Sequence, residues 1–259
     1  VIIKNHGLIT FGDSFASGEG TNGAEGDCGR SDTAFAALLA ADLDAELHHP
    51  ACTGARIEDV EAQVRSLGGE RVPVAVLSIG GNDAGYASVL ADCLGVDDVT
   101  RALTGDDDRL DLACDVDGAE LMARAEALGP RLVGVYGRVV DEVLTDDGRL
   151  VVLTYPPLFE APDTWPVEEG ERCDGISRPD AALLRGAAEV LREEILGAVD
   201  AVRGAEAVDL TDVYDGHGRC GPDPWINGLR LRPSLRASFH PADEGHRATA
   251  DALAALLSR

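Results

Sequence analysis

Short apolar runs alternate with helical stretches along the chain, and this alternation limits the possible folds more than any other feature. The runs at residues 72–79 and 150–155 are almost unbroken in hydrophobicity, as in strands that are covered on both faces. Shorter strands are predicted at residues 7–11, 45–49 and 207–210. Strands that alternate with helices in this way predict an α/β fold, with a parallel sheet between two layers of helices.

Apolar residues with helical spacing fill the intervals between the strands. Helices are predicted over residues 33–43, 57–67, 119–145, 178–202 and 241–257. No linker or change in composition interrupts this pattern. We therefore expect residues 1–259 to form a single domain, a three-layer α/β/α sandwich.

The formal net charge of −25 excludes several classes of partner. Such a field repels a phosphate backbone, so we expect no nucleic acid to bind. A nucleotide carrier of the flavodoxin type is disfavoured on the same ground, and because the chain has no phosphate-binding GxGxxG or P-loop motif. No apolar segment is long enough to cross a bilayer, so we expect no stable membrane insertion. We also expect a monomer.

Six cysteines lie far apart in turn-like stretches, at positions 28, 52, 93, 114, 173 and 220. They form no CxxC pair and lack the histidine spacing of a zinc site, so we expect neither a metal nor a cofactor. An even number of separated cysteines favours three disulfides and an oxidising compartment, although these spacings leave the pairing open. We therefore expect a secreted protein whose leader was removed before Val1.

Polar or glycine-rich motifs follow the first three predicted strands, at the edge where parallel sheets bind ligands. After the first strand, Gly-Asp-Ser places Ser14 at the start of a helix, where negative charge is favoured. After the second, Thr-Gly offers the Gly54 N–H group, and after the third, Gly-Gly-Asn offers the Asn82 amide as a donor to an oxyanion. Each motif alone is an ordinary turn, and Ser14 alone reads as a helix N-cap.

A serine hydroxyl needs a neighbouring base before it can act as a nucleophile. The chain has six histidines, and most histidines in proteins are structural or lie at the surface. Only His240 immediately precedes a helix, in a loop that can return over the first strand. The sequence therefore favours a pair formed by Ser14 and His240.

Taken together and in this order, the four motifs resemble the SGNH (GDSL-type) hydrolases, from GDSFASGEG near the start to SFHPADEGH near the end. The resemblance implies a flavodoxin-like sheet of five parallel strands and hydrolysis of an acyl ester through an acyl-serine intermediate. It implies Ser14 as the nucleophile and His240 as the base. The N–H groups of Ser14 and Gly54 and the Asn82 amide would hold the oxyanion.

The cysteines and the stretches GHGRC and PWING look like the secreted actinobacterial branch of these esterases and lipases. That branch implies three disulfides between neighbouring cysteines: Cys28–Cys52, Cys93–Cys114 and Cys173–Cys220. Its expected substrate is a small-molecule or lipid acyl ester.

One position departs from the family pattern. Three residues before the catalytic histidine the family usually has an aspartate, and this chain has Ala237. We hypothesise a Ser–His dyad in which the Ala237 carbonyl accepts a hydrogen bond from His240 Nδ1. The competing hypothesis is that Asp212 or Asp215 orients the ring instead. Asp13 is expected to be structural and to bind nearby loop amides.

The substrate pocket is the least constrained part of the prediction. Trp225, Ile226 and Leu229 are predicted to line an acyl pocket, although an apolar loop packed into the core would explain them nearly as well. The acidic insert at residues 92–117 is a candidate lid. Alternatives are a carbohydrate O-acetyl esterase and a noncatalytic binding module that retains the fold. Aromatic residues make up only 4% of the chain, which leaves little for a sugar-stacking platform and favours acyl chains.

Overall fold

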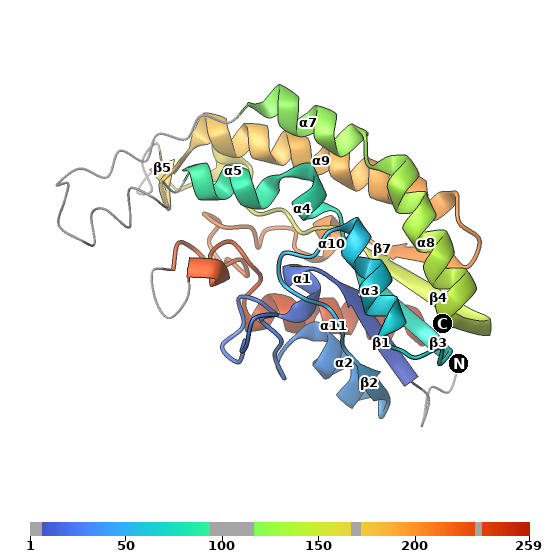
Figure 1. The fold of residues 1–259 in the computed structure, drawn as a ribbon. Coiled ribbons are helices and arrows are strands. Elements are labelled where there is room, and N and C mark those ends of the chain that lie inside the picture. Colours follow the sequence, from blue (N-terminus) through green and yellow to red (C-terminus); the bar gives the residue numbers. More distant parts are fainter. Residues whose placement is uncertain (1–6, 94–116, 167–171, 231–234) are drawn as a thin grey trace.

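The computed structural model describes residues 7–93, 117–166, 172–230 and 235–259, and these contain one five-stranded parallel sheet (Figure 1). Its strands are β1 (Gly7–Gly12), β2 (Glu46–His48), β3 (Val72–Ser78), β4 (Leu144–Leu153) and β7 (Ala205–Val208). They lie in the order β2-β1-β3-β4-β7, and every neighbouring pair is parallel. This doubly wound order is the flavodoxin-like one, so the predicted fold class is confirmed.

Helices cover both faces of the sheet (Figure 1). On one face lie α3 (Val60–Arg65), α8 (Gly129–Val143) and α9 (Arg178–Asp200), with α7 (Gly118–Glu126) packed against α9. On the other face lie α2 (Phe35–Leu43) and α11 (Asp243–Leu257).

Alternate residues of each central strand enter opposite hydrophobic clusters. In β4, Val152 packs with the helices of the first face and Val151 with those of the second. The same alternation separates Leu77 from Val76 in β3. Because both faces are covered, both sets of side chains must be apolar, which explains the unbroken hydrophobicity of these strands.

Shorter elements follow the carboxyl ends of the strands. The helices α1 (Ser14–Ser17), α4 (Gly81–Ala84) and α10 (Leu210–Val213) come after β1, β3 and β7, respectively. Further short elements are the helices η1 (Ile57–Asp59), α5 (Tyr86–Cys93), η2 (Pro162–Thr164) and η4 (Leu235–Ala237), and the small hairpin of β5 (Arg172–Cys173) and β6 (Ile176–Ser177). The helices α1, α4 and η4 belong to the site described below.

The prediction of one helix over residues 119–145 is wrong. The structure divides it into α7 and α8, and β4 begins at Leu144, inside the predicted helix. Pro130 lies in the first turn of α8, a position that proline favours because it lacks the N–H group that a helix interior requires. Leu144 pairs with Val72 across a register shift, so β4 extends beyond the apolar run.

Two of the implied disulfides, Cys28–Cys52 and Cys173–Cys220, are present in the structure. The third, Cys93–Cys114, and nearly all of the insert at residues 92–117 lie outside the described residues. Among the helices of the described ranges, none combines the length and hydrophobicity needed to cross a membrane.

Candidate active site

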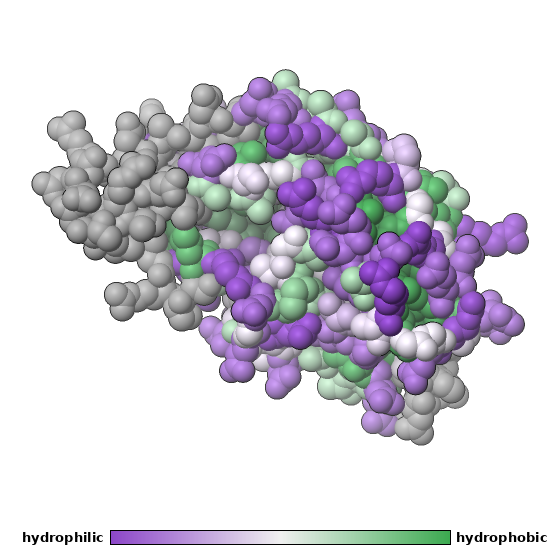
Figure 2. Space-filling model, viewed as in Figure 1, coloured by the Kyte–Doolittle hydropathy of each residue, from purple (hydrophilic) through white to green (hydrophobic). Residues whose placement is uncertain are grey.

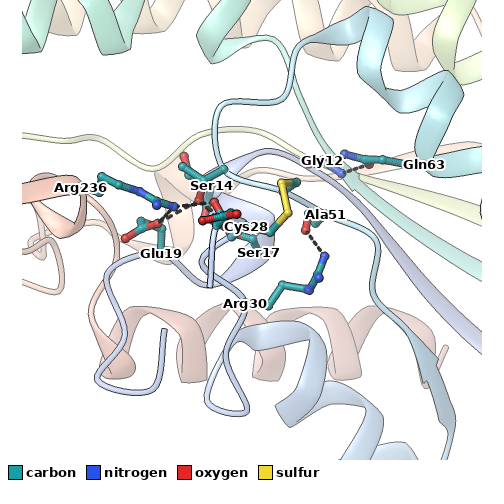
Figure 3. The surroundings of a disulfide bond; sticks show 12 residues. Gly12, Ser14, Ser17, Glu19, Cys28, Arg30, Ala51, Gln63 and Arg236 are labelled. Atoms are coloured by element: carbon teal, nitrogen blue, oxygen red, sulfur yellow. Dashed lines mark hydrogen bonds and ion pairs between the residues drawn. A yellow bond between two sulfur atoms is a disulfide. The ribbon is translucent and has the colours of Figure 1, made fainter. Parts of the chain in front are cut away.

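The nucleophile candidate is placed by a sharp turn at the end of β1. Gly12 has a φ of 132°, and a Cβ atom there would come within 2.1 Å of the Ser78 carbonyl oxygen, so only glycine fits. The backbone of Gly12 makes two hydrogen bonds with the Gln63 amide, at 2.8 and 2.9 Å (Figure 3). Asp13 caps α1 by accepting from the Phe15 N–H group. Ser14 thereby becomes the first residue of α1, as the sequence predicts.

The structure brings Ser14 and His240 together. The Nε2 atom of His240 lies 2.8 Å from the Ser14 Oγ atom, although the two residues are 226 positions apart. The imidazole comes from the loop between η4 and α11, which returns over the end of β1. Its ring also packs against Phe15, with 5.0 Å between ring centroids.

The acceptor for the other ring nitrogen differs from the prediction. His240 Nδ1 lies 3.0 Å from the carbonyl oxygen of Ser238, not that of Ala237. The Ala237 carbonyl instead accepts from the His240 backbone N–H group, at 3.4 Å. Phe239, between them, has a φ of 57°, and this left-handed turn folds the Ser238 carbonyl back toward the ring. A backbone carbonyl does occupy the expected role, but it belongs to the next residue.

The competing hypothesis of an acidic partner is not supported by the geometry. Asp212 and Asp215 are both exposed, and neither carboxylate contacts the ring. A carbonyl only accepts hydrogen bonds, so it fixes the proton on Nδ1 and leaves Nε2 free to accept from the serine hydroxyl. Burial lowers the pKa of His240, and the hydrogen bond to Ser238 partly offsets this effect. The ring is therefore neutral near pH 7, as a general base must be.

The three predicted oxyanion donors lie in the three segments that follow β1, β2 and β3. Ser14 opens a helix, where its N–H group has no intrahelical acceptor. Gly54 has a φ of 81°, and its N–H group has no acceptor in the described part of the chain. The Asn82 Nδ2 atom donates to the Ala55 carbonyl at 2.9 Å, which fixes the amide beside the Gly54 turn and leaves its second hydrogen available.

The disulfide Cys28–Cys52 ties the segment just before Gly54 to the loop that follows α1. The Cys52 N–H group donates to the Gly12 carbonyl at 3.0 Å, and the Thr53 N–H group donates to the Cys28 carbonyl at 3.1 Å. The turn is therefore fixed both by backbone hydrogen bonds and by a covalent link. A fixed donor needs no reorganisation when negative charge develops.

A tyrosine that the sequence analysis did not identify connects three strand ends. The hydroxyl of Tyr155, just beyond β4, donates to Asp13 and accepts from the Gly81 N–H group at 2.9 Å. Asp13 is 1% exposed, and burial raises its pKa to about 7. Asp13 is thus structural, as expected, but its backbone partner is the Phe15 N–H group in the first turn of α1 and not a loop amide, and it also accepts from the Tyr155 hydroxyl. Only the tyrosine's position just past a buried strand could have signalled this role.

An apolar pocket opens beside Ser14 and His240. It lies among side chains of α1, α5, α9 and the segment after β4, and its apolar lining includes Phe15, Tyr86, Leu90, Leu158 and Leu191. Figure 2 shows that the surface around α4 and α5 is less hydrophilic than the surface over α3. Such a lining suits a hydrocarbon chain attached to a carbonyl group held at Ser14.

The prediction that Trp225, Ile226 and Leu229 line this pocket is wrong. Trp225 stacks on His217, with ring centroids 3.4 Å apart. Ile226 is 1% exposed in the core. Leu229 packs against the same cluster as Leu90 and Leu158 but does not itself line the pocket. This loop is apolar because it closes the core, which is the alternative that the sequence left open.

The described residues contain no group of three or more His, Cys, Asp or Glu side chains able to hold an ion. The site offers a hydroxyl, an imidazole and hydrogen-bond donors. Together these groups can activate a nucleophile and stabilise an oxyanion.

Comparisons with known proteins find similarity over most of the chain. The model of the GDSL-like Lipase/Acylhydrolase family matches residues 10–248, a span that includes both Ser14 and His240. Lipase 1 of Streptomyces coelicolor is 28% identical over 249 residues, which cover 92% of this chain and 82% of that protein.

Two crystal structures are similar over nearly their whole length. An extracellular lipase from Streptomyces rimosus has a TM-score of 0.77 at 25% identity, covering 96% of this chain and 99% of that one. A phospholipase A1 from Streptomyces albidoflavus has a TM-score of 0.76 at 26% identity, covering 97% of this chain and 99% of that one. The similarity therefore includes the arrangement of the elements as well as the short motifs.

Proposed function

The chain belongs to the GDSL-like lipase/acylhydrolase family and is a carboxylic ester hydrolase, and from this premise we propose that Ser14 is its nucleophile and His240 its general base. The observation that carries the proposal is the 2.8 Å contact between His240 Nε2 and Ser14 Oγ. The hydrogen bond from Nδ1 to the Ser238 carbonyl supports a dyad, with a backbone group in place of the usual aspartate.

In the proposed reaction, His240 takes the proton from Ser14 Oγ as this oxygen attacks the ester carbonyl carbon. The Ser14 and Gly54 N–H groups and the Asn82 amide donate to the oxyanion of the tetrahedral intermediate. His240 then protonates the leaving alcohol, and an acyl-serine remains. Water, deprotonated by the same imidazole, attacks the acyl group, and Ser14 recovers its proton as the acid leaves.

We propose that the acyl group is a hydrocarbon chain, which binds in the pocket between α5 and α9. The support is the apolar lining beside Ser14 and the kinship with proteins named lipase and phospholipase A1. A carbohydrate O-acetyl esterase would have no use for a pocket of this lining, because an acetyl group is too short to fill it. The paired serine and histidine also favour an enzyme over a noncatalytic binding module.

We also propose that the protein is secreted and acts as a monomer. Two disulfides and kinship with an extracellular lipase support secretion. The monomer is the sequence-based prediction, and sedimentation equilibrium tests it directly.

The first experiment compares Ser14→Ala with the control Ser88→Ala, whose serine is exposed on α5. We expect Ser14→Ala to lose about 10⁵-fold to 10⁶-fold in kcat and all labelling by a fluorophosphonate, because a dyad acts as a unit. The Ser88→Ala variant should keep both properties. Labelling or full turnover in Ser14→Ala would overturn the assignment of the nucleophile.

The second experiment measures kcat/KM for p-nitrophenyl esters from acetate to palmitate. We expect the value to rise with chain length beyond acetate. Ala188, on α9, lines the pocket, so Ala188→Leu should reduce turnover of long chains more than turnover of acetate. A strong preference of the unaltered protein for acetate would instead favour the O-acetyl esterase.

A further inference from the structure

Glu19 is a buried carboxylate that the proposed reaction does not use. It lies two residues after α1 and is 4% exposed. Its Oε2 atom accepts from Arg236 Nη2 at 2.8 Å and from Thr53 Oγ1 at 2.9 Å; Figure 3 shows the contact with Arg236. A Cβ atom at Gly29 would come within 2.3 Å of the same oxygen, so the chain is shaped to admit this carboxylate. A charge is buried in this way only where it is paired and hydrogen-bonded.

The contacts of Glu19 join the three segments that carry the proposed catalytic groups. Its own N–H group donates to the Ser14 carbonyl at 3.2 Å. Thr53 immediately precedes Gly54, the proposed oxyanion donor. Arg236 lies in η4, four residues before His240, and its guanidinium also donates to the Asp27 carbonyl at 2.9 Å.

We propose that Glu19 is a positioning residue, which holds the Gly54 turn and the His240 loop in register with Ser14 and supplies a buried negative charge where the usual aspartate is missing. The proposal rests on the function proposed above. Glu19 touches neither Ser14 Oγ nor the imidazole in the structure, so it acts through Thr53, Arg236 and its electric field.

The field matters because the imidazole of His240 becomes a cation when it takes the serine proton. A carbonyl at Nδ1 stabilises that cation less than a full negative charge would. Two charged side chains act on the ring: Glu19 raises the pKa of His240, and Arg236 lowers it.

The two charges are unequally screened. The Glu19 side chain is 5% exposed and the Arg236 side chain 46%, so water weakens the effect of the arginine more. Two further titratable groups lie nearby. His246 of α11 is neutral at working pH, because burial lowers its pKa to about 3, and Asp13, which lines the same pocket as His240, has a pKa that burial raises to about 7. Glu19 is the carboxylate whose charge raises the pKa of His240 and so favours the imidazolium.

The test uses Glu19→Gln, which keeps the shape and removes the charge, assayed in the full-length protein on p-nitrophenyl butyrate. We expect kcat to fall about 10-fold to 100-fold with KM nearly unchanged, because small displacements of catalytic groups cost up to about 100-fold. The acid limb of the kcat/KM profile should move to lower pH, because without the negative charge of Glu19 the pKa of His240 falls.

The double variant Glu19→Gln/Arg236→Gln separates two effects of Glu19→Gln on the pKa of His240: the loss of the negative charge, and the positive charge of Arg236 that no longer has Glu19 as its partner. Its acid limb should lie between those of Glu19→Gln and the unaltered protein. Thr53→Val should lower kcat several-fold without moving the acid limb, because it loosens the turn and changes no charge. As a matched control, Glu206→Gln removes a carboxylate that pairs with Arg149 at the opposite end of the sheet, and it should leave kcat unchanged.

Two results would overturn the proposal. One is a folded Glu19→Gln protein with unchanged kcat and an unmoved acid limb. If Glu19→Gln does not fold, the second result decides: a Thr53→Val protein with full kcat would overturn the proposal. Fluorophosphonate labelling of the unaltered protein distinguishes both from a failure of the proposed function, because it reports Ser14 whatever Glu19 does.

Discussion

The two ends of the central sheet are built on different principles. At the carboxyl end, the strands stop in buried polar groups, among them Asp13, Glu19 and Ser14. At the amino end, the Arg149–Glu206 pair lies partly exposed on β4 and β7. Between the two ends, a cluster of buried apolar side chains lies on each face of the sheet. At the carboxyl edge, uncommon backbone conformations such as those of Gly12 and Phe239 position the reactive groups.

Among changes that leave Ser14 and His240 in place, the largest effect that separates the two regions should come from Asn82→Ala at the carboxyl edge. We expect a loss of about 10²-fold to 10³-fold in kcat, because one oxyanion donor disappears. The free energy of unfolding should change much less, since Asn82 is only half-buried and its side chain makes one hydrogen bond, to Ala55, within the part of the chain that the structure describes. Steady-state kinetics and denaturant unfolding of the same preparation measure the two quantities. A large loss of stability with intact kcat would place Asn82 in the fold and not in the reaction.

The opposite pattern is expected of Leu39→Ala in α2. Leu39 is fully buried in the cluster that joins α2 to β1 and α11. Its truncation should lower the free energy of unfolding by about 2–5 kcal/mol, through lost burial and the cavity that remains. Turnover per folded molecule should be retained, which active-site titration with a fluorophosphonate determines. If turnover per folded molecule fell as well, the apolar layer would also help to position the catalytic groups at the carboxyl edge.

The carboxyl edge should also make stability depend on pH through Asp13. Its pKa is about 7 in the folded protein and near 3.8 when exposed, so the folded state binds more protons between these values. Stability from this group is fully present below pH 3.8 and is lost as pH rises through 7. Asp13→Asn removes that dependence.

Denaturant unfolding between pH 4 and pH 7 measures the difference in free energy between Asp13→Asn and the unaltered protein. As pH rises, we expect the free energy of unfolding of Asp13→Asn to increase relative to that of the unaltered protein, by about 1 kcal/mol per pH unit. His246 titrates with the opposite sign, because burial lowers its pKa to about 3, but it is common to both proteins and cancels. A difference that stays constant with pH would show that Asp13 is ionised throughout the range.

Sequence predicted the two regions unequally well. The parallel sheet between two helical layers followed from apolar runs that must be buried on both faces, whereas its flavodoxin-like arrangement of five strands followed from the resemblance to the SGNH hydrolases. The motifs at the strand ends also indicated which of the six histidines meets Ser14, because a parallel sheet gathers its carboxyl ends at one edge. Local patterns sufficed for these features.

The features that were missed depend on conformation or on distant packing. The choice of the Ser238 carbonyl over that of Ala237 depends on a left-handed φ at Phe239, an uncommon conformation for a bulky residue. The acyl pocket is formed between α5 and α9, whose side chains meet only in the folded protein. Trp225 was assigned to the pocket because an apolar loop residue looks the same whether it faces a ligand or the core.

The smallest expected effect comes from backbone strain away from the site. Asp44, which ends α2, has a φ of 51°, and Phe239 at the site has a φ of 57°. At Asp44 this conformation serves only to end the helix, so Asp44→Gly should raise the free energy of unfolding by up to about 1 kcal/mol, because glycine adopts it without steric cost. Thermal unfolding should show the gain, with kcat unchanged. If stability falls instead, the side chain of Asp44 contributes more than its conformation costs, and left-handed residues outside the site are not a liability of this fold.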